Sequence, residues 1–208
     1  MTLGEVLVVS PSIDDKSRDL QDPGLYVFRA DRGSRKGQEV LVWASGAQRG
    51  KQAPSSLVKR DGGHTEYRLL SPEKVGPLPE VEVLGIHYTK VRPERRDAFE
   101  RFVGETLHPA VGRLRPDLRI LYYRAVEGGG ASNYIALFAL TRASRDRYWP
   151  GGSDSDELRA AFTTVQPLAK ELSTYLVEGS YLADPKFAAA VYESREWTDF
   201  VLVPTKPR

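Results

Sequence analysis

The sequence has no cysteine among its 208 residues, a single methionine and three histidines. Without thiols the chain cannot form a disulfide, a thiolate nucleophile or a cysteine-ligated metal centre. It also has no apolar run of about 18 residues, and its first residues lack the basic start and apolar core of a signal peptide. We therefore expect a cytoplasmic protein with no membrane partner.

A strong excess of charge of one sign is absent too. Thirty Lys and Arg residues stand against twenty-eight Asp and Glu residues, for a formal net charge of +2. The one dense basic stretch, which holds Arg29, Arg32, Arg35 and Lys36, lies in a connection with Gly and Ser and indicates a solvated turn. Because basic side chains alone form no groove or stacking surface, we expect no nucleic-acid partner.

Three motif classes are missing: a Gly-rich phosphate loop, a Ser-centred nucleophile elbow and a HExxH zinc motif. Nucleotide-dependent and hydrolase chemistry are disfavoured accordingly. What is present is a composition of 40% apolar, 10% aromatic and 28% charged residues, which is typical of globular domains. A Pro-rich connector at 76–79 predicts a boundary there. We expect three units in all, at 1–79, 80–184 and 185–208.

The segment 80–184 predicts alternating strands and helices. The expected elements are a strand at 81–91, a helix from Pro93 to an end marked by Pro109 and Gly112, strands at 118–126 and 133–140 around a Gly turn, a long capped helix from about 156 to 176, and a strand at 178–182. That order, βαββαβ, is the ferredoxin-like α+β pattern.

Apolar residues occupy both faces of these predicted strands, whereas two helices cover only one face. Ile135 and Leu137 alternate with Ala136 and Phe138, for example. A second sheet must therefore pack face to face against the first. Four strand-like runs at 5–10, 24–30, 39–45 and 66–71 can supply it, either as a degenerate, helix-poor tandem copy or as a plain β-meander. A last strand at 197–203, after a short helix at 186–193, either joins a sheet edge or crosses to a partner subunit.

The strand sequence Leu84-Gly85-Ile86-His87-Tyr88-Thr89-Lys90-Val91, its helix and the step Leu107-His108-Pro109 resemble the dimeric α+β barrel superfamily. That superfamily includes EthD-like proteins, NIPSNAP-like proteins and antibiotic-biosynthesis monooxygenases. The resemblance implies two ferredoxin-like sheets packed face to face, in a homodimer or an internal pseudo-dimer, with a small-molecule pocket between each sheet and its helices. It identifies no specific member, so no catalytic residue is transferred.

His87 is the candidate acid or base, because imidazole exchanges protons near neutral pH. A hydrogen-bonded core histidine is the structural alternative. Tyr123 and Asn133, on the predicted hairpin, are expected to orient the substrate by hydrogen bonds. These three residues form the predicted catalytic set.

Five further residues are predicted to contact the substrate: Tyr88, His108, Tyr134, Tyr148 and Trp149. Each has a structural alternative. His108 at a helix end can cap the last carbonyl groups, and Tyr148 with Trp149 can anchor a loop instead of forming a lid.

The acidic run Asp154, Asp156 and Glu157 is better explained by helix N-capping than by metal binding, so we expect no metal. Haem occurs in the superfamily, but three histidines without a recognisable context do not favour it, and we expect no cofactor. The leading hypothesis is a cofactor-independent enzyme that acts by acid/base chemistry on a small apolar or aromatic molecule, as a cyclase, isomerase or dehydratase. The alternatives are a non-catalytic ligand-binding or assembly protein and a cofactor-free monooxygenase.

Overall fold

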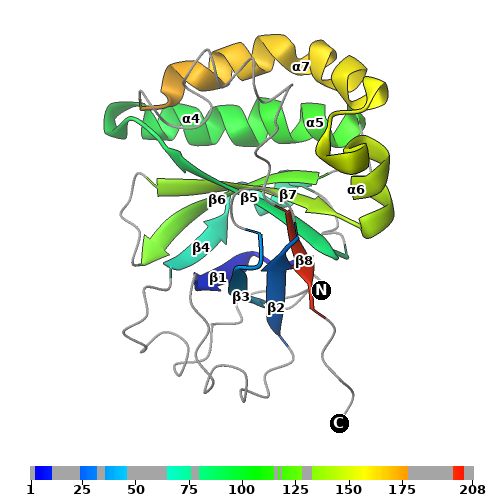
Figure 1. The fold of residues 1–208 in the computed structure, drawn as a ribbon. Helices are drawn as coiled ribbons and strands as arrows, with labels where there is room; N and C mark the ends of the chain where they lie inside the picture. Colours follow the sequence, from blue (N-terminus) through cyan, green and yellow to red (C-terminus); the bar gives the residue numbers. More distant parts are fainter. Residues whose placement is uncertain are drawn as a thin grey trace.

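A computed structural model describes residues 3–10, 24–31, 36–45, 65–75, 80–114, 117, 119–127, 133–177 and 199–203. In them, eight antiparallel strands close a barrel in the order β1-β3-β2-β8-β5-β7-β6-β4 (Figure 1). The strands are β1 (Val6–Ser10), β2 (Leu25–Ala30), β3 (Glu39–Ala44), β4 (Thr65–Leu69), β5 (Val83–Lys90), β6 (Arg119–Glu127), β7 (Asn133–Leu140) and β8 (Asp199–Leu202). Eight of the nine predicted strands are thereby found within a few residues of their expected bounds.

The two halves of the barrel share one strand order. Numbered within its own half, each sheet runs fourth, first, third, second: β4-β1-β3-β2 in the first half and β8-β5-β7-β6 in the second. The halves join where β2 pairs with β8 and where β4 pairs with β6. A meander would pair β1 with β2, whereas β1 pairs with β3 and β4. The tandem ferredoxin-like prediction is confirmed, and the barrel closes within one chain.

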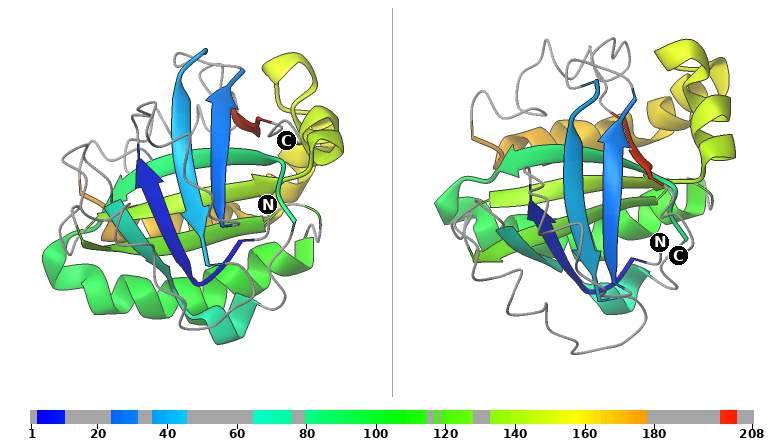
Figure 2. Two further views of the ribbon diagram at one scale, coloured as in Figure 1. Left: turned by 90° about the horizontal axis from the view of Figure 1, so that it is seen from below. Right: turned by 60° about the horizontal axis from the view of Figure 1, so that its bottom comes forward.

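The long helices lie in one layer, over the outer face of β5, β7 and β6 (Figures 1 and 2). The helical segments are α3 (Pro72–Val75), η1 (Pro93–Arg95), α4 (Arg96–Phe102), the π-helical η2 (Val103–Leu107), α5 (His108–Leu114), α6 (Arg142–Tyr148), η3 (Pro150–Gly152) and α7 (Asp156–Tyr175). Among the described helices, none combines the length and apolar character needed to cross a membrane.

Pro109, one of the two residues predicted to mark the end of the first helix, does not end it, whereas Gly112 lies in its last turn. Helix α4 continues through η2 into α5, which ends at Leu114. Proline in a helix removes one backbone donor and clashes with the preceding turn. The wider π turn lies directly before Pro109, with the His108 N–H bonded to the Val103 carbonyl. That widening accommodates the proline, so the chain needs no break there.

The strand that pairs with the first residues of β5, Val83–Gly85, is β8. The expected strand at 178–182 and the expected helix at 186–193 fall outside the described residues. Leu176, directly after α7, makes an antiparallel bridge to Val91 at the far end of β5. Of the two alternatives for the last strand, joining a sheet edge is the one observed.

Two apolar cores lie on opposite sides of the β5-β7-β6 sheet. The helix-facing core, which includes Val83, Phe99, Tyr122 and Leu158, fills the space beneath α4, α5 and α7. The barrel core, which includes Leu7, Phe28, Leu84 and Tyr123, fills the space between the two sheets. Both faces of the second sheet are therefore buried, as its double-sided apolar pattern predicts.

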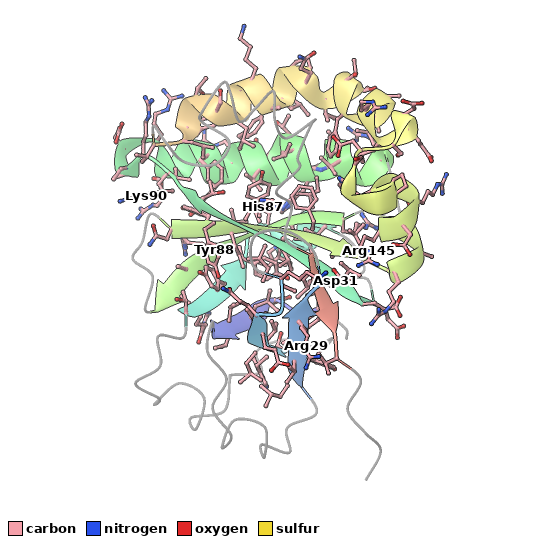
Figure 3. All side chains as sticks on the ribbon, in the orientation of Figure 1. Arg29, Asp31, His87, Tyr88, Lys90 and Arg145 are labelled. Carbon is pink, nitrogen blue, oxygen red and sulfur yellow. The ribbon has the colours of Figure 1, made fainter. Side chains whose placement is uncertain are left out.

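An ion pair ties the two halves together at the rim. Arg145 of α6 donates to the Asp31 carboxylate just beyond β2, at 2.6 Å (Figure 3). The Arg145 side chain is 9% exposed and Asp31 is 40% exposed. This contact holds the C-terminal helix layer in register with a strand of the N-terminal half.

Candidate functional site

The pairing register places three rows of side chains on the helix-facing side of the second sheet. Residues directly opposite each other in neighbouring strands point to the same face. Read from β5 through β7 to β6, the rows are Gly85-Phe138-Ile120, His87-Ala136-Tyr122 and Thr89-Tyr134-Arg124. The helix-facing core holds four of these nine residues and Ile120 packs against it, which fixes the side to which the rows point.

His87 stands in the middle row, on the side of β5 that faces the helices (Figure 3). Its ring meets Phe138 edge-on, with ring centroids 5.0 Å apart and planes at 67°. The residue is half-buried, its Nε2 atom is buried, and burial lowers its pKa to about 4. The imidazole is therefore neutral at neutral pH and can accept a proton.

Ala136 separates His87 from Tyr122 in the middle row. With two strand spacings between them, the Cα atoms of His87 and Tyr122 lie about 10 Å apart. The alanine is buried, yet it offers only a methyl group between two rings. Phe99 of α4 covers the neighbouring part of the row, edge-on to Tyr122 at 5.9 Å and to Tyr134 at 4.8 Å.

Polar groups gather in the row beyond His87. The Tyr134 hydroxyl donates to Glu100 Oε1 of α4 at 2.7 Å, and Arg124 donates to the same oxygen at 2.9 Å. Burial, then the Glu100 carboxylate, raises the pKa of Tyr134. Thr89, at the other end of this row, is buried on β5. The site thus has an apolar row, a histidine row and a polar row.

The predicted catalytic set is not brought together. Tyr123 points into the barrel core, and its hydroxyl donates to the Gly4 carbonyl at 2.9 Å. Asn133, opposite Lys90, has the strand parity of Ile135 and so faces the barrel side as well. The sheet therefore stands between His87 and both of its expected partners.

The predicted substrate contacts also divide between the faces. Tyr88 follows His87 and so points to the opposite side of β5, where it is 46% exposed (Figure 3). Tyr134 does lie on the helix-facing side, one row from His87. Of these two tyrosines, Tyr134 alone shares a face with the histidine.

His108, the first residue of α5, contacts the sheet on β6, next to the end of β4. Its Nε2 atom accepts the backbone N–H of Tyr122 at 3.1 Å, just beyond the last residue that β4 pairs with β6. The imidazole replaces a missing strand partner for that N–H group. Burial lowers the pKa of His108 to about 4, in agreement with a neutral ring that accepts at Nε2. Capping of a helix end, our structural alternative, is wrong because α5 begins at this residue.

Tyr148 and Trp149 are almost wholly buried at the end of α6. The Tyr148 hydroxyl donates to Asp117 at 2.6 Å, and the Arg147 guanidinium lies over the Tyr148 ring at 5.5 Å from its centroid. These contacts favour the anchoring alternative over a lid.

The acidic run serves the start of α7. Ser155 is the N-cap, since its hydroxyl accepts the Leu158 N–H. Asp156 pairs with Arg159, and Glu157 pairs with Arg147 at 2.6 Å. Burial raises the pKa of Asp154 to about 6, and Trp149 and Arg159 lower it in part. Within the described residues, no three metal-ligating side chains gather in one place.

Sequence reasoning did not decide between Tyr122 and Tyr123, and it did not place Ala136 and Thr89 on the face of His87. The alternation of each strand was visible, but both parities are apolar, so alternation alone does not say which parity faces the helices. The register across the hairpin is the signal that joins Tyr122, rather than Tyr123, to the face of His87.

No protein-family model matches this chain. No curated protein matches it either. Among solved structures, a monooxygenase-like protein from Listeria innocua aligns with a TM-score of 0.50 at 14% identity, over 98% of this chain and 96% of that one. A ferredoxin-fold protein related to antibiotic-biosynthesis monooxygenases, from Listeria monocytogenes, aligns with a TM-score of 0.48 at 16% identity, over 98% and 97% of the two chains. At such identities the likeness is one of fold.

Proposed function

Because the chain has the fold of the dimeric α+β barrel superfamily, we propose that it is a cofactor-independent enzyme for a small aromatic or apolar molecule. The molecule binds over Ala136, between the β5-β7-β6 sheet and the helix layer. His87 removes a proton from a hydroxyl group or an acidic C–H group of the ligand. Tyr122 takes the orienting role that we had given to Tyr123, because it shares the face of His87.

One observation carries this proposal: His87 is desolvated and yet keeps accessible surface. A histidine that serves packing alone is expected to be fully buried. A partly buried residue with a pKa of about 4, beside Phe138 and Ala136, fits a position next to an apolar binding site. Concave sites with few polar groups are the usual form of small-molecule sites.

The chemistry follows from the low polarity around the ring. A neutral imidazole with a pKa of about 4 is a weak base in the free protein. When the ligand gives up its proton, the anion formed lies beside the new imidazolium, and an opposite charge at that distance raises the histidine pKa. The same proton can return to another atom of the ligand, which gives an isomerisation, a cyclisation or a loss of water.

Two alternatives compete for the same site. The anion can instead react with dioxygen, and the description of the Listeria innocua protein as monooxygenase-like makes this a reaction to test by oxygen uptake. A non-catalytic binding protein is the other alternative. It predicts that His87 is fully buried, whereas the residue keeps a part of its surface exposed and buries its Nε2 atom.

Replacing Ala136 by leucine tests the location of the site. We expect Ala136→Leu to weaken the binding of 2-naphthol, a bicyclic phenol used as a probe, by at least about tenfold, because the new side chain occupies the space of the ligand. Binding is followed by the fluorescence of the probe. Folding is followed by circular dichroism and urea unfolding.

The matched control is Ala139→Leu, on the same strand but in the barrel core. Overpacking a filled core costs about 1–3 kcal/mol. Both alanines are almost wholly buried, so we expect both variants to lose stability, while Ala139→Leu keeps the affinity for 2-naphthol. Equal affinity of wild type and Ala136→Leu would place the ligand elsewhere.

A further inference from the structure

The side chain of Thr89 places a buried hydroxyl group next to the proposed site. The residue is 3% exposed on β5, two positions after His87. Its Oγ1 atom is buried, and no group among the described residues forms a hydrogen bond with it. The strand parity that it shares with Val83 and Val91 directs it to the helix-facing core.

Packing does not explain why this residue is threonine. Valine has the same shape, is equally suited to a strand, and lacks the hydroxyl group. A buried hydroxyl without a partner costs free energy, so valine would make the more stable fold. The hydroxyl of the cross-strand neighbour Tyr134 donates to Glu100 and forms no hydrogen bond with Thr89.

The spacing of Thr89 and His87 matches a ligand with two polar atoms. Side chains at positions i and i+2 of a strand point the same way, with Cα atoms about 6.6 Å apart. On the neighbouring strand β7, Ala136 lies opposite His87 and Tyr134 lies opposite Thr89. A ring system over Ala136 that reaches His87 with one oxygen can reach Thr89 with a second.

We infer that Thr89 determines specificity at this site: its hydroxyl hydrogen-bonds a second oxygen of an aromatic ligand whose first oxygen lies at His87. The ligand class is an aromatic compound with two hydroxyl or keto groups on one ring or on adjacent rings. This inference rests on the proposed function, and it narrows the substrates from aromatic molecules in general to dioxygenated ones.

The experiment compares Thr89→Val and Thr89→Ser with the wild type, using 1,3-dihydroxynaphthalene and 2-naphthol as probes. Thr89→Val is expected to bind 1,3-dihydroxynaphthalene about tenfold more weakly, the loss of one buried hydrogen bond, and to bind 2-naphthol as the wild type does. Thr89→Ser, which keeps the hydroxyl group, is expected to retain most of the affinity for both probes.

Stability gives a second, independent readout. Thr89→Val is expected to raise the Tm, since it removes an unsatisfied buried hydroxyl group. Unchanged binding of 1,3-dihydroxynaphthalene by Thr89→Val would overturn the inference, as would an equal loss for both probes. The proposed function fails separately, namely when the wild type binds neither probe or when Ala136→Leu leaves both affinities unchanged.

Discussion

His87→Ala is expected to lower the turnover of an identified substrate by about 10²–10⁴-fold, the usual contribution of a positioned acid or base. The change removes the imidazole that is proposed to accept the proton of the substrate. Because alanine is smaller, substrate affinity should change far less than turnover. Steady-state kinetics that separate kcat from KM measure both effects.

The pH profile identifies the same residue. The low-pH limb of kcat/KM reports the free-enzyme pKa of the essential base, so it should fall near pH 4 rather than near the ordinary histidine value. Tyr123→Phe is the matched control, because Tyr123 lies on the opposite face of the sheet. A limb near pH 6.5, or equal turnover by His87→Ala, would remove His87 from the mechanism.

Stability is expected to fall steeply as the pH drops from about 6.5 towards 4. His87 and His108 both have pKa values lowered from 6.5 to about 4 by burial. Between these values the unfolded chain binds protons that the folded chain refuses, so the stability present above pH 6.5 is lost as the pH falls. Each histidine contributes up to about 3 kcal/mol to this loss.

Asp154 acts in the opposite direction. Its pKa is raised from 3.8 to about 6, so its contribution is complete below 3.8 and is lost as the pH rises through 6. It therefore offsets part of the histidine effect. Urea unfolding at pH 7 and pH 4.5 should show a smaller acid loss for His108→Gln, which keeps an acceptor for the Tyr122 N–H. Equal losses of stability in the wild type and in His108→Gln would contradict the assignment of part of the acid loss to His108.

The sequence carried enough information for the strands and for their arrangement in two similar halves. Strands β5, β6 and β7 have dense apolar and aromatic runs bounded by Pro and Gly, so their bounds were found nearly to the residue. Burial on both faces followed from the same runs. The strand order of the first half needed the pairing of β1 with β3 and β4, which no local pattern encodes.

Two features of the fold lay beyond local sequence rules. Pro109 was taken as a helix stop, because a local rule does not foresee a π turn that makes room for proline. The strand that pairs with Val83–Gly85 is β8, which comes from the end of the chain. Both depend on contacts that form only when the whole barrel closes.

The positions of the candidate residues in the fold could be predicted only in part. His87 was chosen for its chemistry, and the structure places it beneath the helices, on the side where the family resemblance implies a pocket. Tyr123 and Asn133 were chosen for their functional groups, without knowledge of the face to which they point. A shift of one residue along a strand exchanges the two faces, so Tyr122 and Tyr123 cannot be told apart by residue type.

A titration of the wild-type protein with 2-naphthol, followed through the histidine ring resonances in NMR spectra, tests the location of the ligand most directly. The His87 resonance is assigned by its loss in His87→Gln. We predict that it shifts and saturates together with the fluorescence signal of the probe. A bound probe that leaves the His87 resonance in place would contradict a site between the sheet and its helices.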